Sequence, residues 1–285
     1  MNREEYREQI RREIEEERAG ASDEASLLSA APEDPRNADQ LLEVLGDPSR
    51  GADARRAALQ ALQQLSFHTP LFARIRPAYI ATLRKVIEDP DQRLREMAIE
   101  ALAQEKDEYV QRRLVDGLER REEPLVPDEK AIQFLGYDIH AQHFPVIRRL
   151  ARESADAATR REAVKLLSSD TQSADLLAGI YDDKNEDDDV RRASVSALMS
   201  VDPLKFEERA KQVVVDDSDA ESVRAASLTA LTYFANPTAL ASDTDFVDRV
   251  ASVGAGAPEL LGLGTEGEGD LAKAVRLFRA KYASR

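Results

Sequence analysis

The chain has 285 residues, no cysteine, no tryptophan and a formal net charge of −15 at pH 7. The absence of cysteine excludes disulfides, thiolate chemistry and cysteine-ligated zinc sites. The acidic balance disfavours nucleic acid, whose binding depends largely on neutralising phosphates, and anionic membrane surfaces. The composition therefore favours a protein partner and indicates binding to neither nucleic acid nor membrane.

The N-terminal segment, residues 1–38, is predicted to be a charged helix followed by a linker. The helix, residues 3–18, carries arginine and glutamate on nearly every face, and its apolar stripe is limited to Tyr6, Ile10 and Ile14. Such a helix either docks loosely on the rest of the chain or pairs with another chain. The small, polar and proline-containing residues that follow are typical of a linker.

Residues 39–253 are dominated by a motif that returns about every 32 residues. In each copy an arginine is followed by a small residue three positions later and by leucine seven positions later. A period of this length indicates a repeat array of stacked helix pairs, in which each unit buries its core against its neighbours. The motif arginines are Arg55, Arg95, Arg160, Arg191 and Arg224, and a sixth copy has Asp128 in the arginine position.

A first helix with its own apolar seam precedes each motif. Between the two helices lies a short turn that often begins with aspartate, as at Asp47-Pro48 and Asp89-Pro90, where proline ends the first helix. The seams are Leu41/Leu42/Leu45, Leu83/Val86/Ile87, Leu114/Val115/Leu118, Val146/Ile147/Leu150, Leu176/Leu177/Ile180 and Ala210/Val213/Val214, and a seventh is Phe246/Val247/Val250.

Residues 254–285 are predicted to close the array. A glycine-rich loop comes first, and Asp270 then caps a last helix. Leu271, Val275, Phe278 and Tyr282 would lie on one face of this helix. A terminal unit of unusual sequence is expected, because it must cover the open end of the stack.

A helix, an aspartate-containing turn and the pattern apolar-Arg-x-x-Ala-apolar-x-Ala-Leu resemble the HEAT-like repeat, in the short form called the phycobilisome-lyase HEAT-like repeat. The resemblance covers about residues 39–235. It implies an all-α, right-handed curved α-solenoid (an α/α superhelix) of about six to seven helix pairs, with the second helices lining the concave face.

The resemblance also implies a structural ladder in which turn aspartates bond to the motif arginines of neighbouring units. The best matches are Asp89 with Arg95 and Asp187 with Arg191, and Asp128 would interrupt the ladder. The position of the arginines beside the apolar face agrees with such a structural role, because a hydrogen bond to a charged group stabilises by about 1.5–3 kcal/mol. An anion-binding stripe is the alternative.

The first and fifth positions after each arginine should point away from the helix seam. If they form the concave face, the partner-binding surface is acidic in repeats two and three and basic in repeats four and five. The pairs are Arg56/Gln60, Glu96/Glu100, Glu129/Gln133, Arg161/Lys165, Arg192/Ser196 and Ala225/Thr229.

An insertion of about eight residues separates the first two motif copies. Aromatic residues interleaved with arginines in this segment can form a peptide- or nucleotide-binding loop. Alternatively, the aromatic rings pack against the first repeats. The candidate residues are Phe67, Phe72, Arg74, Arg76 and Tyr79.

Two groups of residues contain metal-binding residue types. His140 and His143 could share a helical face, but no third ligand stands at a fixed spacing, and neither is followed by glutamate. The acidic run 182–189 lacks the glycine of a calcium loop. We therefore expect no metal site, and an acidic ridge where this run meets Asp216 and Asp217.

No nucleotide loop, nucleophile elbow or zinc-protease motif occurs in the sequence. We predict a non-catalytic scaffold or adaptor without a cofactor, which binds a protein partner with basic and acidic patches. Since no signal peptide or membrane-spanning run is recognisable, we expect it in the cytoplasm. The alternatives are a bilin or chromophore lyase, a small-ligand-binding HEAT protein, and a HEAT-like DNA-binding or base-excision protein, which the net charge disfavours.

Overall fold

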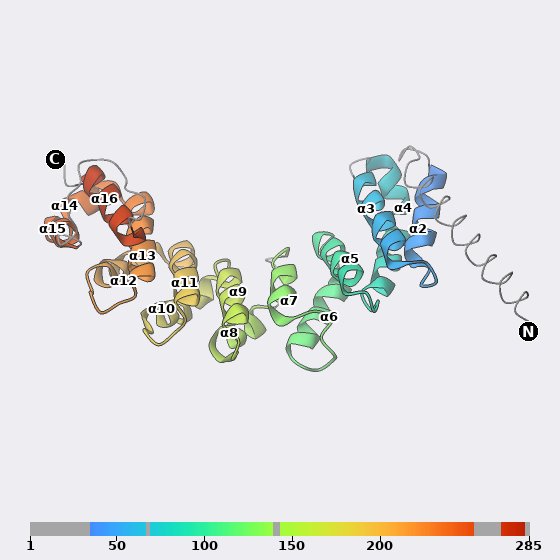
Figure 1. Ribbon diagram of the computed structural model, residues 1–285, viewed down its shortest axis with the longest axis horizontal. Coiled ribbons are helices and arrows are strands. Elements are labelled where there is room, and N and C mark those ends of the chain that lie inside the picture. Colours follow the sequence, from blue (N-terminus) through green and yellow to red (C-terminus); the bar gives the residue numbers. More distant parts are fainter. Residues whose placement is uncertain (1–34, 67–68, 139–142, 254–268, 283–285) are drawn as a thin grey trace, which may run out of the picture. The chain divides into compact units, whose positions relative to one another are not determined.

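The computed structural model describes residues 35–66, 69–138, 143–253 and 269–282 (Figure 1). Within these ranges the regular secondary structure is helical and contains no strand, so the predicted all-α class is confirmed. No helix in the described part of the chain is long and apolar enough to cross a membrane. The helix predicted at residues 3–18, Phe67, His140 and the glycine-rich stretch 254–268 lie outside the described residues.

The described helices alternate along the chain between first and second helices of a repeat, as expected for an α-solenoid. The first helices are α2 (Pro35–Gly46), α4 (Thr69–Val86), α6 (Glu108–Leu118), α8 (Phe144–Glu153), α10 (Ala174–Asp182), α12 (Pro203–Val214) and α15 (Thr244–Ser252). The second helices are α3 (Ala52–Leu65), α5 (Gln92–Gln104), α7 (Asp128–Leu135), α9 (Ala157–Leu167), α11 (Asp188–Val201), α13 (Glu221–Phe234) and α16 (Asp270–Tyr282), and the short α14 (Pro237–Ser242) precedes α15.

The helices form two compact units, residues 1–127 and residues 128–285. In unit 1, α3 and α4 each pack on both α2 and α5. In unit 2, the second helices stack in chain order, α7 on α9, α9 on α11, α11 on α13 and α13 on α16. Helix pairs therefore occur in both units, and the limits predicted for the array, 39–253, and its curvature stay predictions.

Aspartates in the turns start many of these helices. The side chain of Asp91 accepts a hydrogen bond from the backbone N–H of Leu94 at 2.7 Å, and Asp156 accepts one from Thr159 at 2.8 Å. Each bond satisfies a backbone donor that the first turn of a helix leaves without a partner. At the start of α2 the predicted linker ends early, because Pro35 already belongs to the helix and proline is favoured in a first turn.

The predicted apolar seams form the core of each repeat. Leu45, Leu83, Ile147 and Leu177 are completely buried, as are many of their seam neighbours. Leu42, Val115 and Leu176 are exceptions that stay partly exposed.

The insertion before the second motif is helical, so the predicted loop is wrong. Helix α4 runs without interruption from Thr69 to Val86. The side chains of Phe72, Ile75, Tyr79 and Leu83 are buried and recur every three or four residues, which is the helical period. The extra residues thus lengthen a first helix at its N-terminal end.

Candidate interaction surfaces

Arg191 joins three elements in the interior of unit 2. Its Nε donates to the carbonyl of Tyr181 in the preceding helix at 3.0 Å. Its two terminal nitrogens donate to both carboxylate oxygens of Asp219 in the next turn, at 2.6 and 2.9 Å. The arginine side chain is 1% exposed and that of Asp219 is 2% exposed. Such a buried bidentate pair fixes the register between two neighbouring repeats.

The other motif arginines make related contacts. Each donates to a carbonyl, a carboxylate or both, in its own repeat or the next. Arg55 bonds to the carbonyl of Leu45 and pairs with Asp89, Arg95 bonds to the carbonyls of Asp89 and Leu125, Arg160 pairs with Glu186, and Arg224 bonds to the carbonyl of Val214 and pairs with Asp217.

The specific ladder pairs expected from the sequence are wrong by one repeat. The carboxylate of Asp89 pairs with Arg55 of the preceding repeat, and Arg95 reaches only its backbone carbonyl. Asp187 caps α11 through the N–H groups of Asp189 and Val190, while Arg191 pairs with the following turn. An arginine on a second helix is long enough to span the stacking distance, so Arg55, Arg160 and Arg191 pair with acids of the next repeat. Arg224 is an exception, because it pairs with Asp217 of its own turn.

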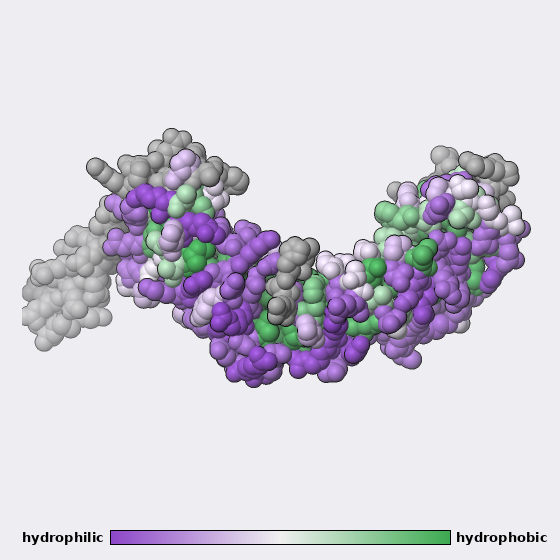
Figure 2. All heavy atoms as spheres, turned by 180° about the vertical axis from the view of Figure 1, so that it is seen from behind, coloured by the Kyte–Doolittle hydropathy of each residue, from purple (hydrophilic) through white to green (hydrophobic). Residues whose placement is uncertain are grey.

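In unit 2 the predicted face carries basic side chains at its surface. Lys165 and Arg192 are exposed and Arg161 is partly exposed. Asp189 lies between the two arginines, 3.8 Å from Arg161 and in contact with Arg192. On the side of the molecule drawn in Figure 2, hydrophilic residues cover most of the surface, and smaller hydrophobic patches lie among them.

Glu162 organises this face, and sequence analysis missed it. It is almost buried, and its carboxylate accepts from Lys165 at 2.8 Å and lies 3.5 Å from Arg161. Although burial raises the pKa of Glu162, hydrogen bonds from Lys165, Gln133 and Arg161 outweigh it and lower that pKa. An acid three residues before a lysine on a helix was the signal that could have identified it.

Other members of the predicted face are only partly available. Arg56 is largely covered and bridges Asp53 of its own helix and Asp91 of the next turn. Ala225 is buried, because a methyl side chain does not reach past its neighbours. The remaining positions, Gln60, Glu96, Glu100, Glu129, Gln133, Ser196 and Thr229, are exposed or partly exposed.

Unit 1 contains a groove with a volume of ≈ 470 Å³ between α3, α4 and α5. Its lining includes Phe72 and Tyr79, whose rings meet edge to face with centroids 5.5 Å apart. Gln60 and Glu100 line the same groove. The structure therefore brings residues of the predicted partner-binding face together with residues of the predicted binding loop. Burial and the charge of Glu105 raise the pKa of Tyr79, which keeps its phenol neutral.

The arginines of the predicted binding segment lie on the exposed side of α4. Arg76 pairs with Glu105 at 2.7 Å, at the rim of the groove. Arg74 is 3.4 Å from Asp39 on α2. The two arginines therefore form ion pairs with residues outside α4 and do not line the groove.

His143 is 2% exposed, and in the described part of the chain neither of its ring nitrogens has a hydrogen-bond partner. Its ring instead lies 5.1 Å from that of Phe144, measured between centroids. Burial lowers the pKa of this imidazole, an effect that the charge of Asp138 partly opposes. The environment favours the neutral ring.

Acidification from about pH 7.5 to about 5.5 should therefore destabilise unit 2 through His143. The unfolded chain keeps a histidine pKa near 6.5 and binds the proton first. The contribution of the neutral His143 ring to the free energy of unfolding is complete above that pKa. It is lost as the pH falls below it, by at most about 1.4 kcal/mol per pH unit. Denaturant unfolding at both pH values should show a smaller loss for His143→Phe than for the wild type, and equal losses would contradict the assignment.

Comparison with known proteins agrees with the repeat pattern. Residues 38–129 match the family model described as HEAT repeats. A solved structure of human deoxyhypusine hydroxylase in complex with glycerol aligns with 88% of this chain and 97% of that chain, at 14% identity and a TM-score of 0.38. No curated protein matches the chain. The family match at residues 38–129 confirms the HEAT-like character, and the phycobilisome-lyase subtype stays a prediction.

Proposed function

We propose that this HEAT-like repeat protein is a non-catalytic scaffold that binds a partner protein on the exposed faces of its second helices. The observation that carries the proposal is the basic surface formed by Arg161, Lys165 and Arg192 in a chain of net charge −15. Positive charges that gather on one face of stacked helices in an otherwise acidic chain support recognition of an acidic segment of the partner.

The ion pairs on this surface are of the kind that a partner can replace. Asp189 and the two arginines around it are all at least one-third exposed, and exposed pairs stabilise by only about 0–1 kcal/mol. A partner carboxylate can therefore take the place of Asp189. Glu162 stays nearly buried and keeps Lys165 oriented.

Reversing two charges on this surface should remove the partner. We expect Arg161→Glu with Arg192→Glu to lower the amount of partner recovered from a native cell extract by at least about tenfold, since like charges would then face each other. Affinity purification with quantitative mass spectrometry measures the change.

The matched control reverses Arg112 and Arg249, two exposed arginines on the first helices α6 and α15. It changes the net charge equally but leaves the second helices intact. Circular dichroism should show both variants folded. Recovery of the same partner in the same amount by both double variants would contradict the proposed surface.

Small-ligand binding is a second candidate, favoured by the groove in unit 1. A volume of ≈ 470 Å³ falls within the range of small-molecule sites, and Phe72 and Tyr79 supply aromatic surface. Addition of a bilin to the purified protein tests this function through a shift in absorbance. Two variants separate stacking on the rings from polar recognition of the ligand. Tyr79→Phe keeps the ring and removes only the hydroxyl. Gln60→Leu with Glu100→Gln removes polar groups of the lining.

A further inference from the structure

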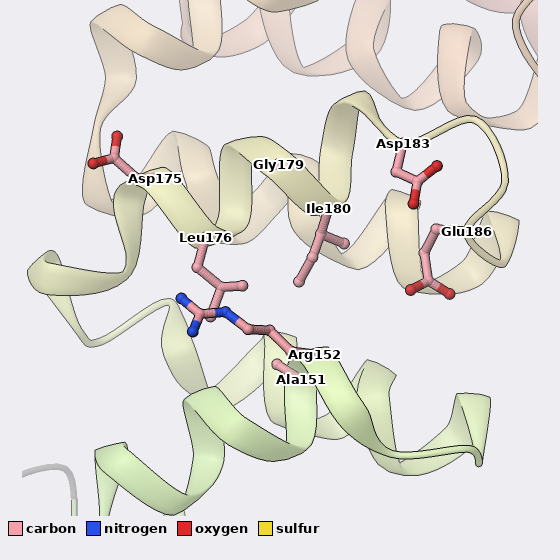
Figure 3. A pocket seen from close by; sticks show the side chains of 8 residues that line it. All are labelled: Ala151, Arg152, Asp175, Leu176, Gly179, Ile180, Asp183 and Glu186. Atoms are coloured by element: carbon pink, nitrogen blue, oxygen red, sulfur yellow. The ribbon is translucent and has the colours of Figure 1, made fainter.

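A second groove lies on the first-helix side of unit 2, between α8 and α10 (Figure 3). Its volume is ≈ 420 Å³. Leu176 and Ile180 extend from α10 toward α8, and Ala151 faces them from α8. Leu176 belongs to the predicted core seam but remains partly exposed, so apolar surface lines an open groove.

Gly179 stands in the middle of α10 beside this groove, and the fold gives no reason for a glycine. A Cβ atom added there would meet no atom within 4 Å. The φ of Gly179 lies outside the left-handed range, so its backbone conformation does not require a glycine. A glycine in a helix interior costs about 1 kcal/mol relative to alanine. Its usual compensation is the close approach of another backbone, and no described part of this chain comes that near.

The charges along the groove are unevenly distributed. Arg152 extends from α8 beside Leu176, while Asp183 and Glu186 lie at the C-terminal end of α10 (Figure 3). Asp175, at the N-terminal end of α10, pairs with Lys205 at 2.6 Å, and Glu186 pairs with Arg160. The C-terminal end of the groove continues into the acidic run, where Lys184 bonds to Asp216 of the next repeat.

We propose that the groove between α8 and α10 is a docking site for an amphipathic helix of a partner protein. Apolar side chains of that helix pack on Leu176 and Ile180, and its backbone passes close over Gly179. A lysine or arginine near one end of the helix lies beside Asp183 and Glu186. The site is on the first helices and does not depend on the binding face proposed above.

The test uses the full chain and a randomised library of 14-residue peptides, selected for binding to the wild-type protein. Selected peptides should combine apolar residues at helical spacing with lysine or arginine toward one end. Their affinity, measured by fluorescence anisotropy, should fall at least about tenfold for Gly179→Met, because the added side chain occupies the path of the helix backbone. The control Ala81→Met adds a similar side chain to the exposed surface of α4 and should leave the affinity unchanged.

A second variant tests the charges without disturbing the fold. Asp183→Asn keeps an oxygen that can accept from the N–H of Asn185, as Asp183 does at 3.0 Å, but removes the negative charge. It should weaken the selected peptides about threefold to tenfold, more strongly at low salt. Selection of acidic peptides, or affinities equal in the wild type and Gly179→Met, would overturn the proposal. Tighter binding of a peptide spanning residues 1–20 would also overturn it, because the occupant would then be a segment of this chain.

Discussion

Replacing Arg191 with methionine should lower the free energy of unfolding of unit 2 by about 3–5 kcal/mol. The substitution leaves the carboxylate of Asp219 buried without its cation, and it removes two hydrogen bonds to the carbonyl of Tyr181. A buried charge without a partner is far more costly than a missing surface pair. Urea denaturation followed by circular dichroism measures the loss.

Arg192→Met is the matched control, because it removes the same charge one residue away, at an exposed position. Its effect should stay within about 1 kcal/mol. The double variant Arg191→Met with Asp219→Leu removes both charges and should recover a large part of the lost stability. Equal, small effects for Arg191→Met and Arg192→Met would show that the buried pair is not what holds the two repeats together.

The repeat architecture could be predicted because the packing problem recurs in each repeat. Every second helix meets a neighbour of the same kind, so the same small and apolar residues return at the same spacing. The insertion at α4 broke the regular period and suggested a loop. The helical spacing of Phe72, Tyr79 and Leu83 was present in the sequence and was the better guide.

The partners of the motif arginines could not be predicted in the same way. Arg95 stands six residues after Asp89, and Arg191 stands four residues after Asp187, so proximity along the chain suggested these pairs. In the structure the acids closest in sequence cap helices, as Asp187 does, or accept from an earlier repeat, as Asp89 does. The choice depends on the distance between stacked helices, which sequence spacing does not contain.

The candidate sites, too, have features that the sequence predicts and features that depend on how the helices pack. Exposure of Arg161, Lys165 and Arg192 follows from helical periodicity and was predicted. The orientation of Lys165 by Glu162 and the open space over Gly179 depend on contacts between helices. A glycine between two apolar seam residues, Leu177 and Ile180, was nevertheless visible in the sequence as a helix position with an unexplained cost.

Truncating Phe278 to alanine should destabilise unit 2 by about 3–5 kcal/mol. Helix α16 packs on α13 in the place of a further second helix, and Phe278 is completely buried there. Its ring meets that of Phe246 edge to face at 5.8 Å and lies 4.9 Å from that of Tyr282, measured between centroids. The hydroxyl of Tyr282 and the ammonium of Lys281 both donate to the carbonyl of Thr232 at the end of α13.

Leu277→Ala provides the control, because Leu277 is the preceding residue of the same helix and is 40% exposed. It should change the free energy of unfolding by less than about 1 kcal/mol. If both variants unfold like the wild type, α16 does not close the stack. If Phe278→Ala alone is destabilised, the last helix stabilises unit 2 by covering the apolar side of α13, as a terminal repeat must.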